Sequence, residues 1–536
     1  MIHCIIVSTY NYYPDERCLR LRETLLLNSF VLVLTQFSMK PCYREYVRVQ
    51  AGRNPCLGGL MSFLSTGSYG SPLEKVNIYC IDHKSQPDTE ATARKVSFDE
   101  CAAEIERGRA LGNCVRQTLI VEDISPALIE KFGALLDINP MFFANYIGTS
   151  FDGLNEPLPP AMALFPTRMA SSRMLHIHYQ KVVNLQDRDN NGPPAYHVFQ
   201  NPTTVPRSSR RLLPISGALP GLVRGCCSIL LQTLSPLSWV CLILVDSTSL
   251  GSTAIRKPNK EVSDDVGQVC LQPLQGGFED FQEPMSFTAF CSATDEERLD
   301  SEWKHQSLLH LLLRYSVKAP PAFDPCQPSI VSLGYYALRV IAAEWMLYLR
   351  LLNSYLKHYE YSFYHASRVP LEADLDELQR WRRRCKQSSH KLCLVELFLD
   401  KQLSGSQSSN AVNKVDQYVA LRDDFRYLAS EIDHSCRYLE LILPMAGTII
   451  QLVDTRQSIK ESVNVRYLTY IGLVFLPLTF ISGLFSMSDG FIPGQRDFWI
   501  YIAVAAPLLF VVLGSALAFS LLGRRKYDAK ASRYIV

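Results

Sequence analysis

The residues with the most distinctive chemical pattern form a stripe near the C-terminal end of the sequence. They are spaced by three and four, which places them on one face of a helix. The stripe mixes apolar, small and hydroxyl-bearing side chains, whereas a face exposed to lipid would be uniformly apolar. A mixed face indicates either helix packing or the wall of a pore, and one copy cannot enclose a pore, so a pore requires a homo-oligomer. The stripe consists of Val465, Leu468, Gly472, Leu476, Thr479, Gly483 and Ser486.

The stripe lies mainly in the first of two uncharged segments that are long enough to cross a membrane. Residues 467–488 comprise 22 positions without a charge, or about 33 Å of helix against a hydrocarbon core of about 30 Å. Residues 498–523 comprise 26 positions, and that helix must tilt or overhang. The nine residues between them are mostly polar and include two glycines and a proline. The sequence therefore predicts an antiparallel transmembrane hairpin over residues 467–523.

Basic residues near the ends of the two spans predict their orientation. Cytoplasmic flanks of membrane helices are enriched in Lys and Arg, and here the loop between the spans carries Arg496 alone. We expect both termini on the cytoplasmic side, with residues 524–536 as a basic tail. The absence of an Arg-rich, acid-poor leader favours the plasma membrane over the mitochondrial inner membrane. The flanking residues are Arg456, Lys460, Arg466, Arg524, Arg525, Lys526, Lys530 and Arg533.

Composition and missing motifs argue against several classes of protein. The 54 Lys and Arg against 52 Asp and Glu leave a formal charge of +2, so no global field attracts nucleic acid. The 16 cysteines include no CxxC pair, which argues against a zinc knuckle and, in a chain of this size, indicates reduced thiols. The signatures GxSxG, HExxH and GxxxxGK[ST] do not occur in the sequence. We therefore expect no cofactor, and an enzyme anchored by the hairpin is the least favoured interpretation.

Two regions of different character precede the hairpin. Residues 111–328 predict an α+β cytosolic domain, in which residues 118–122 form a strand, Ser125 and Pro126 begin a helix, and residues 226–246 form a hairpin of buried strands. Residues 329–466 predict a stalk of long helices. Residues 1–110 show no long sequence periodicity from which their secondary structure can be predicted.

Three helices are expected from residue 329 onward, over residues 329–365, 371–401 and 412–485. The third comprises 74 residues, or about 110 Å if it is continuous. A helix of that length needs partners along it.

His176 and His178 form a possible metal-binding pair in the cytosolic domain. Two apart on a predicted strand, they point to the same face. The alternative is an ordinary pair on the surface of a strand, which is favoured because no third ligand lies nearby in the sequence.

The segment from Thr455 to Ser488, with "FLPLTFISGLF" at its centre, resembles the stalk and first membrane helix of CorA-type divalent-metal transporters, including the ZntB-like zinc branch. The segment "IVEDISPALIEKFGALLDINPMFFANYI" is similar to the cytosolic domain of fungal CorA-like proteins. This resemblance implies a homopentamer and a funnel of long helices. It further implies a pore lined by the first membrane helix and an ion entrance at a Gly-Met-Asn motif.

Carried onto this chain, the entrance motif falls at Ser486, Met487 and Ser488, so two of its three residues differ. The serine hydroxyl is shorter than the Asn amide that it replaces, which leaves open whether the ion is Mg²⁺ or Zn²⁺. Asp489 follows directly, and five copies would form a ring of negative charge; alternatively, Asp489 only marks the helix end. The pore positions implied by the resemblance are Ser462, Val465, Leu468, Gly472, Leu476 and Thr479.

The resemblance also implies that metal bound between subunits on the cytosolic side holds the pore closed. The candidate carboxylates open the second long helix, where acidic residues are also favoured simply as a helix start. They are Glu372, Asp374, Asp376 and Glu377.

Two functions from different classes follow from these patterns. The first is a homopentamer in lipid that conducts divalent cations. Conduction is expected to be passive, because neither span contains an acidic or basic residue that could relay protons. The alternative is a membrane-tethered sensing or interaction protein with a non-conducting pore, which the altered entrance motif supports.

Overall fold

The computed structural model describes the chain in two compact units. One comprises Met1–His358 with Trp381–Tyr438, here called the sheet unit, and the other Tyr359–Arg380 with Leu439–Val536, here called the hairpin unit. The described residues are 42–66, 76–83, 93–111, 114–148, 168, 171, 173–186, 198–200, 204–205, 207–215, 219–247, 254–255, 270–273, 286–292, 294, 307–320, 323–364, 372–405, 412–487 and 498–531.

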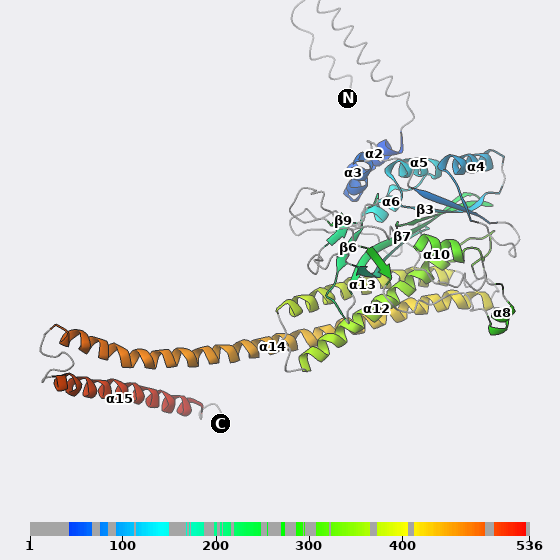
Figure 1. Cartoon of the computed structure of the whole chain (residues 1–536). Helices are drawn as coiled ribbons and strands as arrows, with labels where there is room; N and C mark the ends of the chain where they lie inside the picture. Colours follow the sequence, from blue (N-terminus) through cyan, green and yellow to red (C-terminus); the bar gives the residue numbers. More distant parts are fainter. Residues whose placement is uncertain are drawn as a thin grey trace, which may run out of the picture. The chain divides into compact units, whose positions relative to one another are not determined.

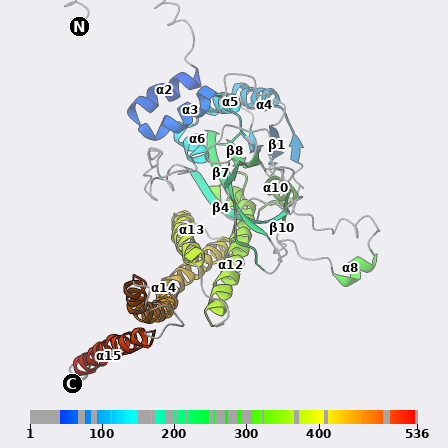
Figure 2. The ribbon, with the colours of Figure 1, turned by 60° about the vertical axis from the view of Figure 1, so that its left-hand side comes forward.

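The sheet unit is built on a ten-stranded sheet (Figures 1 and 2). Its strands follow the order β2-β1-β3-β8-β7-β6-β5-β9, and β4 pairs with β7 and β10. Among the described strand pairs, β3 and β8 run parallel and the others antiparallel. The strands are β1 (Asn77–Asp82), β2 (Ala93–Lys95), β3 (Arg116–Glu122), β4 (Met174–Gln186), β5 (Val198–Gln200), β6 (Ser208–Arg211), β7 (Pro220–Ser235), β8 (Ser238–Val245), β9 (Ala254–Ile255) and β10 (Cys270–Pro273).

The predicted hairpin of buried strands within residues 226–246 is confirmed as β7 and β8. The two strands pair from Cys227 opposite Val245 to Ser235 opposite Ser238, and Pro236 lies in the turn between them. All eight residues of β8 are buried. Such a strand is covered on both faces, so β8 lies at the centre of the domain.

Helices α2 to α6 pack on one face of the sheet, and their core includes Phe132, Phe142 and Phe143, each 0% exposed. The predicted helix start is confirmed, because Ser125 caps α5 by accepting a hydrogen bond from the backbone N–H of Leu128 and Pro126 is its first residue. These elements are α2 (Tyr43–Arg53), η2 (Pro55–Leu57), α3 (Gly58–Thr66), α4 (Phe98–Leu111), α5 (Pro126–Leu136) and α6 (Pro140–Ile147).

The sheet extends across the boundary expected at residue 110. Strand β1 pairs with β3 over the register from Asn77 opposite Glu122 to Asp82 opposite Gln117. Tyr43 of α2 donates its hydroxyl to the carbonyl of Ile138 at 2.7 Å. The region for which the sequence shows no period therefore contributes strands and helices to the same core.

A largely buried carboxylate, Asp246, ties the end of β8 to its surroundings. It accepts two hydrogen bonds from the Arg207 guanidinium at 2.8 and 2.9 Å, one from the Tyr146 hydroxyl at 2.8 Å and one from the backbone N–H of Cys226 at 2.7 Å. Arg207 is 3% exposed. Four donors on one carboxylate compensate for its burial and fix the segment around residue 207 on the sheet.

Long helices lie on the other side of the sheet. The predicted helix over residues 329–365 is divided at Gly334, where an added Cβ would lie 2.6 Å from a side-chain carbon of Ile229 in β7. The close approach explains why a residue without a side chain interrupts the helix there. The helices described between β10 and residue 364 are α8 (Phe287–Ser292), α10 (Leu308–Tyr315), α11 (Ile330–Leu333) and α12 (Tyr335–Tyr364).

The last two predicted stalk helices are confirmed. They are α13 (Glu372–Gly405) and α14 (Val412–Phe485), and α14 has the predicted bounds. Within the sheet unit, α14 buries Leu421, Phe425 and Leu428 at helical spacing. Arg426 of α14 pairs with Glu396 of α13 at 2.7 Å.

Candidate functional site

The second part of α14 and helix α15 (Phe498–Ala531) form the membrane segment of the hairpin unit (Figure 1). Among the described residues, these two helices are long and apolar enough to span a membrane. In each helix, 6% of the most apolar stretch is buried against other parts of the chain. These apolar residues therefore do not form the core of a water-soluble domain. Residues 467–485 of the first predicted span and all of the second, 498–523, are helical.

One face of α14 packs against α15. Ile481 of α14 is 4% exposed and Ala505 of α15 is 6% exposed. The rings of Phe485 and Tyr501 meet edge to face, with their centroids 5.9 Å apart. We call this face of α14 the seam of the hairpin. The buried and partly buried residues of this segment are Leu473, Val474, Pro477, Leu478, Ile481 and Phe485.

The stripe lies on the opposite side of α14 from the seam. At about 100° per residue, Gly472 and Thr479 fall about 180° around the helix from Ile481. Leu476 is 74% exposed, and a Cβ added at Gly472 or Gly483 would meet no atom within 4 Å. Within one chain the stripe is therefore open to contact with lipid, water or other helices.

The stripe presents hydroxyl oxygens between apolar side chains. Thr479 donates its hydroxyl proton to the backbone carbonyl of Phe475, one turn earlier. A hydroxyl bonded in this way turns its oxygen lone pairs outward, where they can accept a hydrogen bond from water. Leu468 is 69% exposed and Val465 62% exposed on the same face, and Ser462 is also exposed. The arrangement can offer acceptors to a hydrated cation next to an apolar constriction.

The entrance motif lies where α14 ends. The backbone N–H of Ser486 still donates to the Ser482 carbonyl at 2.9 Å, and Met487 donates to Leu484 at 3.4 Å in a tighter turn. Met487 is 86% exposed. The carbonyl end of a helix carries partial negative charge, which favours a cation. Residues 488 and 489 lie outside the described residues, so the acidic ring stays a prediction.

The four candidate regulatory carboxylates lie in the first turns of α13. Glu377 is 0% exposed, Asp376 is exposed and Asp374 is partly buried, while the side chain of Glu372 lies outside the described residues. Among the side chains that the structure describes, these acids do not form a converging group of metal ligands. A metal site between subunits stays a prediction.

His176 and His178 lie on the same face of β4, as expected, but the favoured alternative of a surface pair is wrong for His176. His176 is 9% exposed, its Nδ1 lies 2.7 Å from the Ser228 hydroxyl, and its ring lies 5.3 Å from that of Phe142. Burial lowers the pKa of both histidines to about 3. His178 is partly buried, and within the described part of the chain no further ligands converge on the two histidines.

Comparison with known proteins finds a family match in the C-terminal part of the chain. Residues 399–525 match the family described as CorA-like Mg²⁺ transporter protein. The complete structure of the CorA magnesium transporter from Methanocaldococcus jannaschii is 10% identical, covers 81% of this chain and 96% of its own, and has a TM-score of 0.33. The structure of the full-length CmaX protein is 14% identical, covers 83% of this chain and 99% of its own, and has a TM-score of 0.36. No curated protein matches the chain.

Proposed function

We propose that this chain, whose residues 399–525 match the CorA-like Mg²⁺ transporter family, is an integral membrane protein that transports divalent cations. The observation that carries the proposal is the mixed face of α14. It combines Thr479, Leu476 and Gly472 on the side opposite α15, and no described part of the chain covers it. A face of this composition suits a water-filled path better than lipid.

A homopentamer completes the path in this proposal. Five copies of α14 would enclose the stripe, and their ends would bring together five copies of the segment from Ser486 to Asp489. The chain presents both termini to the cytoplasm, in accord with the basic residues that flank its spans. The plasma membrane is the proposed location.

The cation passes hydrated in this mechanism. Mg²⁺ holds its waters tightly, so the entrance binds them through serine hydroxyls and helix carbonyls rather than stripping them. Thr479 accepts hydrogen bonds from these waters, and the ring of Leu476 side chains forms a gate that closes by dewetting. The membrane potential supplies about 2.3 kcal/mol per charge per 100 mV, and twice that for a divalent ion. Zn²⁺ is the alternative cargo.

Uptake into liposomes that contain the purified protein tests the proposal. We expect Mg²⁺ or Zn²⁺ influx driven by an inside-negative potential, and its loss in Leu476→Arg and Thr479→Arg. Thr479→Ser is the matched control, because it keeps the hydroxyl and should retain influx. Equal influx through the wild type and both arginine variants would overturn the assignment of the stripe.

The second candidate function is a membrane tether with a closed pore. The observation that favours it is the entrance motif, which has serine at two of its three positions, Ser486 and Ser488. A wild-type protein that forms pentamers in the membrane and conducts neither ion would support the tether.

Cytosolic metal is proposed to regulate the pore at Glu372, Asp374, Asp376 and Glu377. Neutralising these carboxylates should relieve inhibition by internal metal. Inhibition that persists unchanged in the neutralised variants would remove this role.

A further inference from the structure

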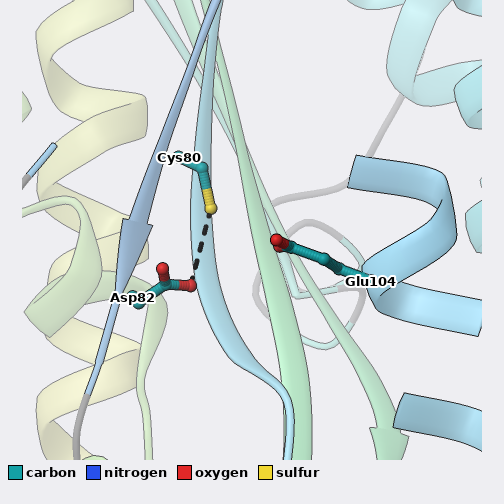
Figure 3. Close-up of side chains that lie close together, drawn as sticks. All are labelled: Cys80, Asp82 and Glu104. Atoms are coloured by element: carbon teal, nitrogen blue, oxygen red, sulfur yellow. Dashed lines mark hydrogen bonds between the residues drawn. The ribbon is translucent and has the colours of Figure 1, made fainter. Parts of the chain in front are cut away.

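One edge of the sheet holds a compact group of metal-ligating atoms, distinct from the membrane segment. The Cys80 sulfur and one carboxylate oxygen each from Asp82 and Glu104 lie within 4.8 Å of one another. Cys80 and Asp82 are two apart on β1 and share one face of the strand, while Glu104 extends toward them from α4 (Figure 3). Among the described residues, this is the one group of its kind.

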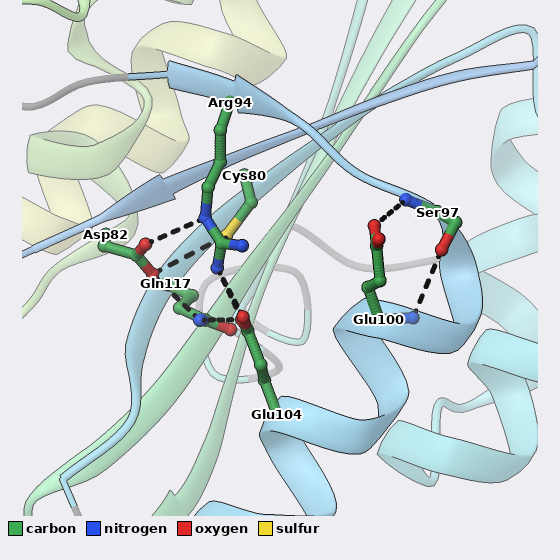
Figure 4. Close-up of polar contacts among 7 residues, drawn as sticks. All are labelled: Cys80, Asp82, Arg94, Ser97, Glu100, Glu104 and Gln117. Carbon is green, nitrogen blue, oxygen red and sulfur yellow. Dashed lines mark hydrogen bonds and ion pairs between the residues drawn. The ribbon is translucent and has the colours of Figure 1, made fainter.

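A cationic side chain already lies at this group (Figure 4). Arg94 of β2 contacts Asp82 through Nε at 3.2 Å and Glu104 through Nη2 at 2.6 Å. The same Nη2 lies 4.0 Å from the Cys80 sulfur. One guanidinium faces two carboxylates, so the group keeps an excess of negative charge.

Gln117 of β3 provides an independent observation. Its side-chain Nε2 donates to Asp82 at 2.8 Å and to Glu104 at 2.9 Å. The residue is 7% exposed, yet its Oε1 has no hydrogen-bond partner. A buried carbonyl oxygen without a partner is costly. As it stands, Nε2 faces the group and Oε1 faces away from it. Rotation of the amide by half a turn would direct the oxygen at the group, where a cation would satisfy it, in exchange for the two hydrogen bonds that Nε2 donates to Asp82 and Glu104.

We propose that Cys80, Asp82 and Glu104, with the Gln117 amide oxygen, bind a divalent cation of the Zn²⁺ type in exchange for Arg94. A sulfur ligand beside carboxylates selects Zn²⁺ or Cd²⁺ over Mg²⁺, which prefers oxygen alone. The Cys80 thiol loses its proton to solvent as the sulfur–metal bond forms. The Arg94 side chain, 41% exposed, swings into water.

The exchange leaves the charge of the group unchanged. Before it, two carboxylates and one guanidinium sum to a single negative charge; after it, two carboxylates, one thiolate and a divalent ion sum to the same value. The Asp82 side chain is 46% exposed and that of Glu104 29% exposed, which gives the ion a route from solvent. The site is independent of the transport proposal, because none of its residues belongs to the hairpin unit.

Cd²⁺ titration of the full chain in detergent tests the site through the ultraviolet thiolate-to-metal absorption. We expect Cys80→Ser to remove the absorption of one equivalent of Cd²⁺ and Glu104→Gln to weaken binding at least tenfold. Cys101→Ser and Glu100→Gln are the matched controls: Cys101 is equally buried on α4, and Glu100 instead accepts from the backbone N–H of Ser97.

The role of Arg94 gives the sharpest outcome. Because Arg94 competes with the ion, Arg94→Met should tighten Cd²⁺ binding at least tenfold. Titrations that are identical in wild type and Cys80→Ser, or an Arg94→Met variant that binds no more tightly than wild type, would overturn the proposal. Circular dichroism of each variant verifies that it is folded.

Discussion

The sheet unit and the hairpin unit use the same residue types for opposite purposes. Leu242 in β8 is 0% exposed, whereas Leu476 on the stripe is 74% exposed. A Cβ at Gly225 would lie 2.5 Å from the Tyr179 ring, whereas one at Gly472 would meet nothing within 4 Å. The sheet unit thus completes its own packing, and the hairpin unit depends on lipid or on other copies to complete it.

The largest contrast is expected between a buried and an exposed ion pair, both within the sheet unit. Asp246→Asn leaves Arg207 buried without its counter-charge and should lower the free energy of unfolding by about 3–5 kcal/mol. Asp433 pairs with Arg437 at 2.5 Å on the exposed surface of α14. Asp433→Asn should therefore lower the free energy of unfolding by less than about 1 kcal/mol. Chemical denaturation followed by tryptophan fluorescence measures both. Equal losses would contradict the contrast.

Leucine truncation sharpens the comparison. Leu242→Ala removes a fully buried side chain and should cost about 2–5 kcal/mol. Leu476→Ala should leave the stability of the sheet unit unchanged and alter cation flux instead. Denaturation and liposome uptake on the same two variants separate the effects. A flux defect confined to Leu242→Ala would reverse the interpretation.

Glycine substitution gives a smaller effect of the same kind. Gly225→Ala forces a methyl group against Tyr179 and should destabilise the sheet unit by about 1–3 kcal/mol. Gly472→Ala adds a helix-favouring residue whose Cβ meets no atom within 4 Å in the described part of the chain, so the stability of the sheet unit should not change. The added methyl group narrows the proposed path and should lower cation flux. Denaturation and liposome uptake measure the two effects, and unchanged flux would contradict the placement of Gly472 on the wall of the path.

Acid should weaken the sheet unit through its buried histidines. The pKa of His176 is lowered by burial from 6.5 to about 3, so the neutral form stabilises the fold. This stability is fully present above pH 6.5 and is lost as the pH falls toward 3, because the unfolded chain takes up the proton first. In His176→Gln, the denaturation midpoint should depend less on pH between 6.5 and 3 than it does in the wild type. His434→Gln, at an exposed position on α14, is the control.

Local periodicity explains which features the sequence could predict. The bounds of α14 and the stripe follow from helical spacing, and the β7–β8 hairpin follows from two apolar runs around Pro236. The side of α14 that packs on α15 could not be predicted, because it depends on contacts such as that between Phe485 and Tyr501. The group around Cys80 could not be found from the sequence, because the packing of α4 brings Glu104 to it and the pairing of β1 with β3 brings Gln117.

The seam and the stripe occupy the same turns of α14, so the spacing of residues there serves two faces at once. Ile481 faces α15, and Thr479, two positions earlier, belongs to the other side. Inserting a single residue after Leu468 would leave the seam intact but rotate Val465 and Leu468 by about 100° away from Thr479. The continuity of the stripe therefore depends on the number of residues between its members, and a one-residue insertion at this point would divide the stripe without changing the spacing of the seam residues that follow it.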